Sequence, residues 1–366
     1  MRTEQRFPVI QTVPSHITDS DDREFDWLVC PLCARPLRVL SQVLECPACR
    51  ENWPVVNGVP RFVEGFSYWG EIPLLQMREV NRRAAVSSWR SALLDSTEPS
   101  VQKAAEMILN TERANWHYML NLPAASRILD IGAGTGTNSH ALAMRFDEVV
   151  ALEPVEERIE FMRHRFAQEQ LSKVKIVQSS LWKLPFPEKS FDVVVMNGVL
   201  EWVAEGQSGD PGEIQLRALR KMLSLLKPGG FLYVGIENRM CPEFLVGYLD
   251  PHCRMPYVTI LPRPIAHWYA RRKGKLNGYR NYIYSSWGYR RLLRRAGFTE
   301  VDAYVALPSY NHPRAFVPLK NNVFEYYCRN FNPVQGSGLR RVTYELLLRV
   351  GLLKHMEDSF VLLARR

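Results

Sequence analysis

Apolar and polar positions change their spacing several times along the chain. In residues 67–122 the apolar residues recur at helical intervals, which predicts two or three helices ahead of the main domain. In residues 123–240 short apolar runs alternate with helix-length stretches, and the expected strands are Arg127–Ile131, Glu148–Leu152, Val174–Gln178, Phe191–Met196 and Phe231–Ile236. Strands joined by helical crossovers pair in parallel, so the pattern predicts an open, doubly wound α/β (Rossmann-like) domain.

Two insertions interrupt this alternation after Ile236. Residues 241–285 are rich in Pro, Tyr, Trp and Arg and have no clear period, and they precede an expected helix and strand in residues 286–305. A second insertion, residues 306–357, contains a helical pattern at Leu339–Leu353, and the last strand of the core is expected within residues 358–366. Long segments of this kind in α/β domains usually form lids or binding elements, so we expect residues 241–285 to form a cap over the site.

The ends of the sequence and its composition narrow the class of protein. Residues 1–23 lack any periodic pattern and predict a flexible tail. The first residues have no apolar signal-peptide region, and no apolar run reaches the roughly 18–20 residues that span a bilayer. With 46% hydrophobic residues the chain can fill a core, which excludes disordered and fibrous classes. We therefore expect a cytoplasmic protein, with contact to a membrane surface as an open alternative.

The net charge of +9 is concentrated in one segment. Between Pro251 and Thr299 there are eleven Lys or Arg residues and no Asp or Glu, whereas the rest of the chain holds 36 basic and 38 acidic residues. An anionic partner would meet the protein there, although runs of charge also form ordinary solvated helix faces.

Four of the seven cysteines form two CxxC pairs with twelve residues between them: Cys30, Cys33, Cys46 and Cys49. Such turns place two thiolates on one metal, and four thiolates satisfy the tetrahedral preference of zinc without leaving a position for water. The pattern predicts a structural zinc site in residues 24–66. An iron–sulfur cluster or a metal-free unit is the alternative.

The cysteine segment, VCPLCARPLRVL followed by LECPACRENWPVVNGVPRF, resembles the zinc ribbon of the Trm112-like family. In bacteria this ribbon is often found ahead of methyltransferase domains. The family includes activators of enzymes that act on transfer RNA and ribosomal components. The resemblance implies an attachment module and does not select a substrate.

A glycine-rich turn follows the first expected strand of the core. Gly132, Gly134 and Gly136 allow a sharp bend and close approach of a ligand to the backbone, and a helix follows. The spacing is GxGxG rather than the GxGxxG of dinucleotide sites, and Asp130 precedes it. A carboxylate here would repel a pyrophosphate but suits the ammonium group of S-adenosylmethionine.

Further motifs follow in order. Glu153 ends the second strand, where an acid can accept both ribose hydroxyls. Ser180, Leu181 and Trp182 follow the third strand, and Asn197 ends the fourth. With the glycine turn and Leu226–Gly230, these motifs resemble class I S-adenosylmethionine-dependent methyltransferases. The resemblance implies a seven-stranded sheet, with Ser180 at the adenine amino group, where the family commonly has an acid. We expect Leu181 and Trp182 to pack on the adenine ring, with a place in the core as the alternative for either.

The acceptor site is expected at the carboxyl ends of the fourth and fifth strands, near Asn197, Glu201 and Glu237. The segments around Ile236–His252, Tyr282–Phe298 and Leu307–Pro313 resemble a less characterised methyltransferase group found in settings of glycan synthesis. This implies O-methylation of a glycan, glycolipid precursor or related secondary metabolite, with an anionic or carrier-linked acceptor. A hydroxyl needs a base, for which we expect His252, at a pKa near neutrality and close to Asp250.

Two alternatives stay open from the sequence. The basic residues of 251–299 are interleaved with Tyr and Trp, which also suits an RNA methyltransferase, because bases stack on aromatic rings while Arg and Lys hold phosphates. A non-catalytic partner protein that retains a cofactor fold is the other alternative. The intact glycine turn and Glu153 argue against it.

Overall fold

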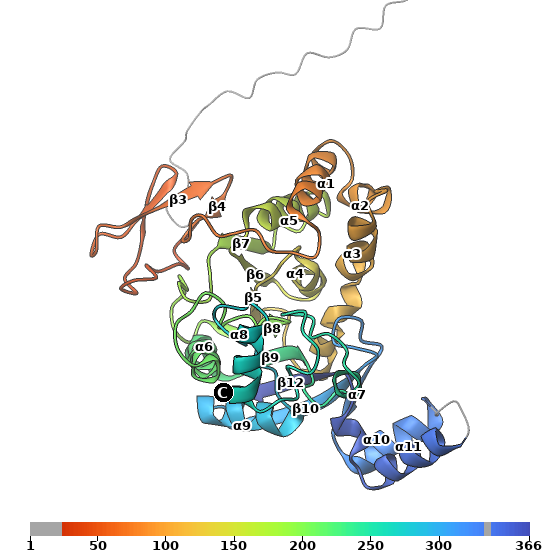
Figure 1. The fold of residues 1–366 in the computed structure, drawn as a ribbon. Coiled ribbons are helices and arrows are strands. Elements are labelled where there is room, and N and C mark those ends of the chain that lie inside the picture. Colours follow the sequence, from red (N-terminus) through yellow and green to blue (C-terminus); the bar gives the residue numbers. More distant parts are fainter. Residues whose placement is uncertain (1–23, 333–337) are drawn as a thin grey trace, which may run out of the picture.

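The computed structural model describes residues 24–332 and 338–366, so the expected tail, residues 1–23, lies outside the described residues. Its centre is a sheet in the order β11-β10-β12-β9-β8-β5-β6-β7 (Figure 1). The strands are β5 (Arg127–Ile131), β6 (Glu148–Glu153), β7 (Val174–Gln178), β8 (Phe191–Asn197), β9 (Leu226–Glu237), β10 (Glu300–Leu307), β11 (Ala315–Pro318) and β12 (Ser359–Arg365). β5 to β9 pair in parallel, and the other three are antiparallel.

The predicted α/β class is confirmed, and all seven expected core strands are present. The sheet nevertheless has eight strands rather than seven, because β11 of the second insertion adds an antiparallel strand beside β10. The order in which the strands are added to the sheet reverses between β5 and β8. In open α/β sheets the ligand usually binds in the crevice at the carboxyl ends of the strands on either side of this switch point.

Four helices connect the core strands: α4 (Thr137–Ala143), α5 (Glu156–Gln168), α6 (Pro211–Leu225) and α9 (Ser286–Ala296). In α9 the apolar side holds the buried Leu292 and Leu293, while four arginines face outward or lie half-buried. The Asp210 side chain caps α6 by accepting a hydrogen bond from the Glu213 amide. The Ser285 side chain caps α9 in the same way, by accepting one from the Gly288 amide.

The lead-in segment forms α1 (Leu74–Val86), α2 (Trp89–Leu94), α3 (Pro99–Leu109) and the 3-10 helix η1 (Thr111–Met119), as its helical spacing predicts. α1 and α2 pack on α5, α3 packs on α2, and η1 packs on α4. Asn81 of α1 donates to the Glu157 carbonyl at 2.8 Å, and the ring of the buried Trp89 lies beneath the guanidinium of the buried Arg165. The lead-in helices are therefore part of the wall beside the glycine turn.

Residues 24–66 form a small four-stranded sheet: β1 (Arg38–Leu40), β2 (Val43–Glu45), β3 (Asn52–Val56) and β4 (Val59–Pro60). This unit is packed on the core. The Phe62 amide donates to the Gln178 carbonyl at 2.8 Å, and the Val29 amide donates to the Pro185 carbonyl at 2.9 Å. Phe62 itself is fully buried among core residues. The unit thereby covers the β7 edge of the sheet, which would otherwise present unpaired backbone groups.

The two insertions add α7 (Pro242–Leu245) and α8 (Arg263–Arg272), then α10 (Asn321–Asn330), α11 (Leu339–Arg349) and the 3-10 helix η2 (Leu353–His355). The helical pattern at Leu339–Leu353 overestimates α11, because Gly351 adopts a φ of +71° and ends the helix. In Figure 1, α10 and α11 project from the body, whereas α7 and α8 lie over the sheet.

Candidate functional site

The glycine turn lies at the carboxyl end of β5, where three glycines have positive φ angles. Gly136 is the N-cap of α4 with a φ of +76°, and a Cβ atom there would lie 2.6 Å from the Phe166 ring. Gly134 is less crowded, because the atom nearest to such a Cβ would be Arg158 Nη1 of α5, at 3.9 Å. The turn is thus tightly packed at Gly136, whereas Gly134 leaves room for a ligand to approach the backbone.

Asp130 lies at the base of this turn and is fully buried. Its carboxylate accepts a hydrogen bond of 2.6 Å from the Ser139 hydroxyl of α4. Burial raises the pKa of Asp130 to about 6, against the lowering effect of Ser139. The Asp130 carboxyl group therefore links β5 to α4 through a hydrogen bond and lies directly beneath the turn.

Glu153 ends β6 and contacts the same turn. One carboxylate oxygen accepts from the Gly134 amide at 2.8 Å and the other from the Val155 amide at 3.0 Å. Burial raises the pKa of Glu153, and Arg158, whose guanidinium lies 4.0 Å from the carboxylate, opposes this shift. These two hydrogen bonds hold the Glu153 carboxylate beside the glycine turn, where ribose hydroxyls can reach its remaining lone pairs.

The residues expected near the adenine and the methionine moiety differ in how far their polar groups are already hydrogen-bonded within the protein. Ser180 accepts a hydrogen bond of 3.3 Å from the Trp182 amide, and Leu181 is half-buried. The Trp182 ring lies under Lys221 of α6, at 5.8 Å. Asn197 accepts from the Tyr233 hydroxyl at 2.9 Å, but its buried Nδ2 has no partner among the described residues. This free donor, the space at Gly134 and Glu153 together fit S-adenosylmethionine.

A cluster of ionisable groups lies at the carboxyl ends of β8 and β9. His252 Nε2 is 3.7 Å from a carboxylate oxygen of Glu201 and 3.7 Å from one of Glu237, and His252 Nδ1 is 3.4 Å from Asp250. The Tyr310 hydroxyl donates to Glu237 at 2.9 Å. We call these five residues the acceptor cluster. The structure thus brings together Glu201, Glu237 and His252, which the sequence places at the acceptor site, and adds Tyr310 to them.

The charges of this cluster correct one expectation from the sequence. Burial lowers the pKa of His252, but hydrogen bonding to Asp250 and Glu201 and the charge of Glu237 outweigh it and raise the pKa to about 11. The pKa is therefore not near neutral, as we expected from the unperturbed value of histidine. At pH 7 the ring carries a proton on both nitrogens and has no lone pair to act as a base.

The carboxylates respond in opposite directions. Burial and the neighbouring Glu201 raise the pKa of Glu237 to about 7, whereas the pKa of Asp250 is lowered, because its contacts with His252 exceed the cost of burial. Glu201 Oε2 and Glu237 Oε2 are buried and have no hydrogen-bond partner among the described residues. Buried polar atoms are normally satisfied, so these oxygens point to a ligand or proton that the site receives.

Trp69, in the segment between β4 and α1, connects the two halves of the site. Its ring is 4.5 Å from that of Trp202 and 4.7 Å from the Arg158 guanidinium. Trp202 in turn is 5.0 Å from the His252 ring, and Arg158 faces Glu153. The sequence analysis did not identify Trp69, because no period or motif marks a tryptophan in an irregular segment.

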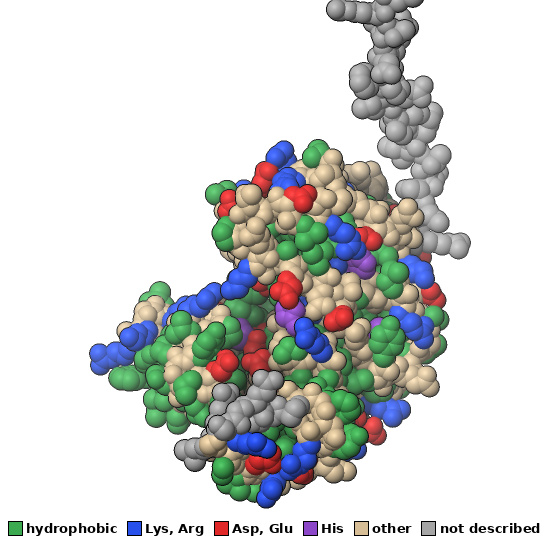
Figure 2. All heavy atoms as spheres, turned by 90° about the vertical axis from the view of Figure 1, so that its right-hand side faces the viewer, with side chains coloured by type: hydrophobic (Ala, Val, Ile, Leu, Met, Phe, Trp, Pro, Cys, Tyr) green, Lys and Arg blue, Asp and Glu red, His purple; other side chains and the backbone are tan. Residues whose placement is uncertain are grey.

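In the basic segment, residues 251–299, several aromatic and basic side chains are buried or bound to other parts of the protein. Tyr279, Tyr282 and Tyr289 are buried, whereas Trp268 and Trp287 are more than half exposed. Arg280 is buried and donates to the carbonyls of three residues that follow β8: Ala204, Gln207 and Gly209. On the face drawn in Figure 2, Lys and Arg side chains follow the upper margin of the lobe on the left and are otherwise scattered among acidic and apolar ones.

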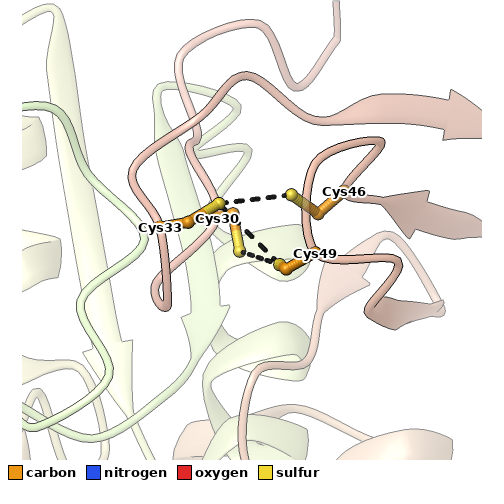
Figure 3. A group of neighbouring side chains, drawn as sticks. All are labelled: Cys30, Cys33, Cys46 and Cys49. Atoms are coloured by element: carbon orange, nitrogen blue, oxygen red, sulfur yellow. Dashed lines mark hydrogen bonds between the residues drawn. The ribbon is translucent and has the colours of Figure 1, made fainter.

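The four cysteines of the CxxC pairs converge from two turns (Figure 3). Their sulfur atoms are 3.5 Å apart for Cys30 and Cys49, 3.4 Å for Cys33 and Cys46, and 3.8 Å for Cys33 and Cys49. Four thiolates around one zinc ion at about 2.3 Å would be about 3.8 Å from one another. The spacing of the sulfur atoms therefore fits a tetrahedral zinc site, and zinc binding is suggested on this ground.

Comparisons with known proteins point to the same region. Residues 129–234 match the methyltransferase domain family. The chain is 38% identical over 111 residues to a demethylmenaquinone methyltransferase of Clavibacter sepedonicus, which covers 30% of this chain and 41% of that protein. It is 28% identical over 197 residues to a ubiquinone biosynthesis O-methyltransferase of Xanthomonas axonopodis pv. citri, covering 51% of this chain and 78% of that protein.

These matches support an S-adenosylmethionine-dependent methyltransferase. The chain spans about two fifths of the length of the demethylmenaquinone methyltransferase. Among solved structures, phosphoethanolamine N-methyltransferase 2 of Haemonchus contortus is 14% identical with a TM-score of 0.43, covering 75% of this chain and 59% of that one. No helix in residues 24–332 or 338–366 is long and apolar enough to cross a membrane.

Proposed function

We propose that this protein transfers a methyl group from S-adenosylmethionine to a hydroxyl oxygen of a small-molecule acceptor. The observation that carries the proposal is the pairing of two sites at one edge of the sheet. The glycine turn and Glu153 follow β5 and β6, and the acceptor cluster follows β8 and β9. A cofactor at the first site would face an acceptor at the second.

On the cofactor side, Glu153 would accept the ribose hydroxyls and the space at Gly134 would admit the cofactor to the backbone. Asp130 keeps the turn in place beneath it, and Ser180 and Leu181 border the adenine. Asn197 Nδ2 offers a free donor. When bound, the cofactor would supply an electrophilic methyl group on its sulfonium sulfur. The acceptor oxygen would form the new bond to the methyl carbon, while the electrons of the carbon–sulfur bond return to sulfur.

On the acceptor side, the chain must orient the hydroxyl and take its proton. Glu201 Oε2 is buried and unpartnered, so we assign it as the proton acceptor. His252 acts as a protonated group that holds the carboxylates in place and offsets their charge.

For the acceptor we propose a hydroxyl on a glycan, glycolipid precursor or related secondary metabolite, as the sequence analysis implies. A phenolic acceptor is the second candidate, because the similarity to the ubiquinone biosynthesis O-methyltransferase extends over half of this chain. Both acceptors need the same proton removal, so a panel of sugars and catechols assayed with labelled S-adenosylmethionine distinguishes them.

RNA is the less favoured acceptor. A base-stacking platform needs exposed aromatic rings beside free cations, whereas Tyr279, Tyr282 and Tyr289 are buried. Arg263 lies among tyrosines, 4.1 Å from the Tyr282 ring, and Arg280 is bound to backbone carbonyls. The arginines of α9 remain available, and they suit a singly charged or carrier-linked acceptor.

For residues 24–66 we propose a structural zinc ribbon. The fourfold thiolate site leaves no position for a reacting group, and the unit packs on β7 rather than on the acceptor cluster. Its role is therefore to fix the edge of the sheet and the segment that carries Trp69.

Removal of the Glu153 carboxylate tests the cofactor site. Glu153→Ala should weaken binding of S-adenosylhomocysteine by about 1–3 kcal/mol, because it removes a charged hydrogen-bonding group from a buried site. Isothermal titration calorimetry measures this directly. Glu156→Ala is the control, since Glu156 is exposed and pairs with Arg61. Equal affinity of the two variants would contradict the assignment.

The zinc site is tested by Cys46→Ser. The wild-type protein should contain about one zinc ion per chain by elemental analysis, and the variant should lose it and expose Phe62, because structural zinc supplies much of the folding energy of such units. Cys328→Ser is a matched control, as Cys328 is buried far along the chain from the cluster. Full zinc content in Cys46→Ser would refute the site.

The salt dependence of binding separates a small acceptor from RNA. A strand contacting four phosphates would give a slope of log K against log salt of about −3, whereas a neutral or singly phosphorylated acceptor gives a slope of about zero to −1. We expect the shallow slope. Filter retention of bulk RNA from about 50 to 300 mM salt measures it. A steep slope together with methyl incorporation into RNA would favour the alternative.

A further inference from the structure

Three side chains of the acceptor cluster have the chemistry and spacing of metal ligands. Glu201, Glu237 and His252 each offer one ligand atom, and these atoms all lie within 4.8 Å of one another. Two of the separations, from His252 Nε2 to Glu201 Oε1 and to Glu237 Oε2, are 3.7 Å. Ligands at about 2.0–2.2 Å from one metal ion are roughly 3–4.4 Å apart, so a small rotation of one carboxylate completes the set.

The groups behind these ligands are arranged to orient them. Asp250 lies 3.4 Å from His252 Nδ1, and is itself held by the backbone amides of His252 and Cys253 at 2.8 and 2.9 Å. This directs the Nε2 atom towards Glu201 and Glu237. The Tyr310 hydroxyl binds Glu237 Oε1 and leaves Oε2 for the centre. A carboxylate behind a histidine is a recurrent support of metal ligands in proteins.

The cluster has more acidic groups than basic ones, and among the described residues its positive charge comes from His252 alone. Three carboxylates, those of Glu201, Glu237 and Asp250, surround a single imidazole, and within the described ranges no Lys or Arg forms an ion pair with any of them. Glu201 is 1% exposed and its Oε2 has no hydrogen-bond partner. Buried carboxylates require compensation, and a divalent cation supplies more of it than one proton does.

We propose that Glu201, Glu237 and His252 bind a divalent metal ion, and that the acceptor coordinates this ion through two adjacent oxygen atoms. This inference rests on the proposed function. An octahedral ion held by three protein ligands keeps three open positions, enough for a vicinal diol, a catechol or a hydroxy acid. Binding of the ion would displace the proton of His252 Nε2 to solvent, so that this nitrogen can coordinate the metal. The metal would lower the pKa of the bound hydroxyl, and Glu201 Oε2, which is not one of the ligand atoms, would take its proton.

Manganese binding tests the metal site without any acceptor. The zinc-loaded protein should bind one Mn²⁺ ion, seen as loss of the free Mn²⁺ signal in electron paramagnetic resonance. Glu201→Gln and His252→Gln should abolish this binding. Asp250→Asn should weaken it by about 10–100-fold, the usual effect of changing a group behind a ligand. Glu213→Gln, on the exposed side of α6, should bind as the wild type does.

The outcome is separable from that of the proposed function. Retained zinc and binding of S-adenosylhomocysteine show that each variant is folded. No Mn²⁺ binding by the wild type, or binding that the three variants do not change, would overturn the metal site. If methyl transfer then proceeds without a divalent ion, the proposed function stands alone. If Mn²⁺ binds and no hydroxyl acceptor is methylated, the metal site stands and the methyl-transfer proposal fails.

Discussion

Burial of three carboxylates around one histidine is the constraint on which the site depends. Glu201 and Glu237 come from the core, His252 and Asp250 from the first insertion, and Tyr310 from the second. None of these groups would be shielded from water by the sheet alone. The two insertions therefore supply the side chains that complete the cluster begun by the core.

The amino-terminal part of the chain closes the cofactor side in a similar way. The cysteine unit is hydrogen-bonded to the β7 edge through Phe62 and Val29, and the segment that follows it carries Trp69 to Arg158 and Trp202. Trp69 thus lies between the group that faces Glu153 and the ring that contacts His252.

The sequence predicts the local features of this architecture well. Strand positions, the glycine turn and the CxxC pairs depend on neighbouring residues and on short spacing, and the structure has each of them where the pattern indicates. β11 was not predicted, because a four-residue edge strand takes its stability from β10 rather than from its own sequence. The predicted pKa of His252 was wrong in part for a related reason: besides the neighbouring Asp250, the pKa is raised by Glu201 and Glu237, which come from distant parts of the chain. Contacts between distant segments, such as that of Trp69 with Trp202, leave no local pattern.

The central proposal is that a cofactor site and a metal-binding acceptor cluster face each other at the carboxyl ends of the parallel strands. Crystals grown with S-adenosylhomocysteine and Mn²⁺ and measured at the manganese absorption edge test this most directly. We predict the cofactor sulfur pointing towards the acceptor cluster, its ribose on Glu153, and an anomalous peak between Glu201, Glu237 and His252. A ligand bound elsewhere, or a cluster with no peak and a sulfur turned away from it, would contradict the account.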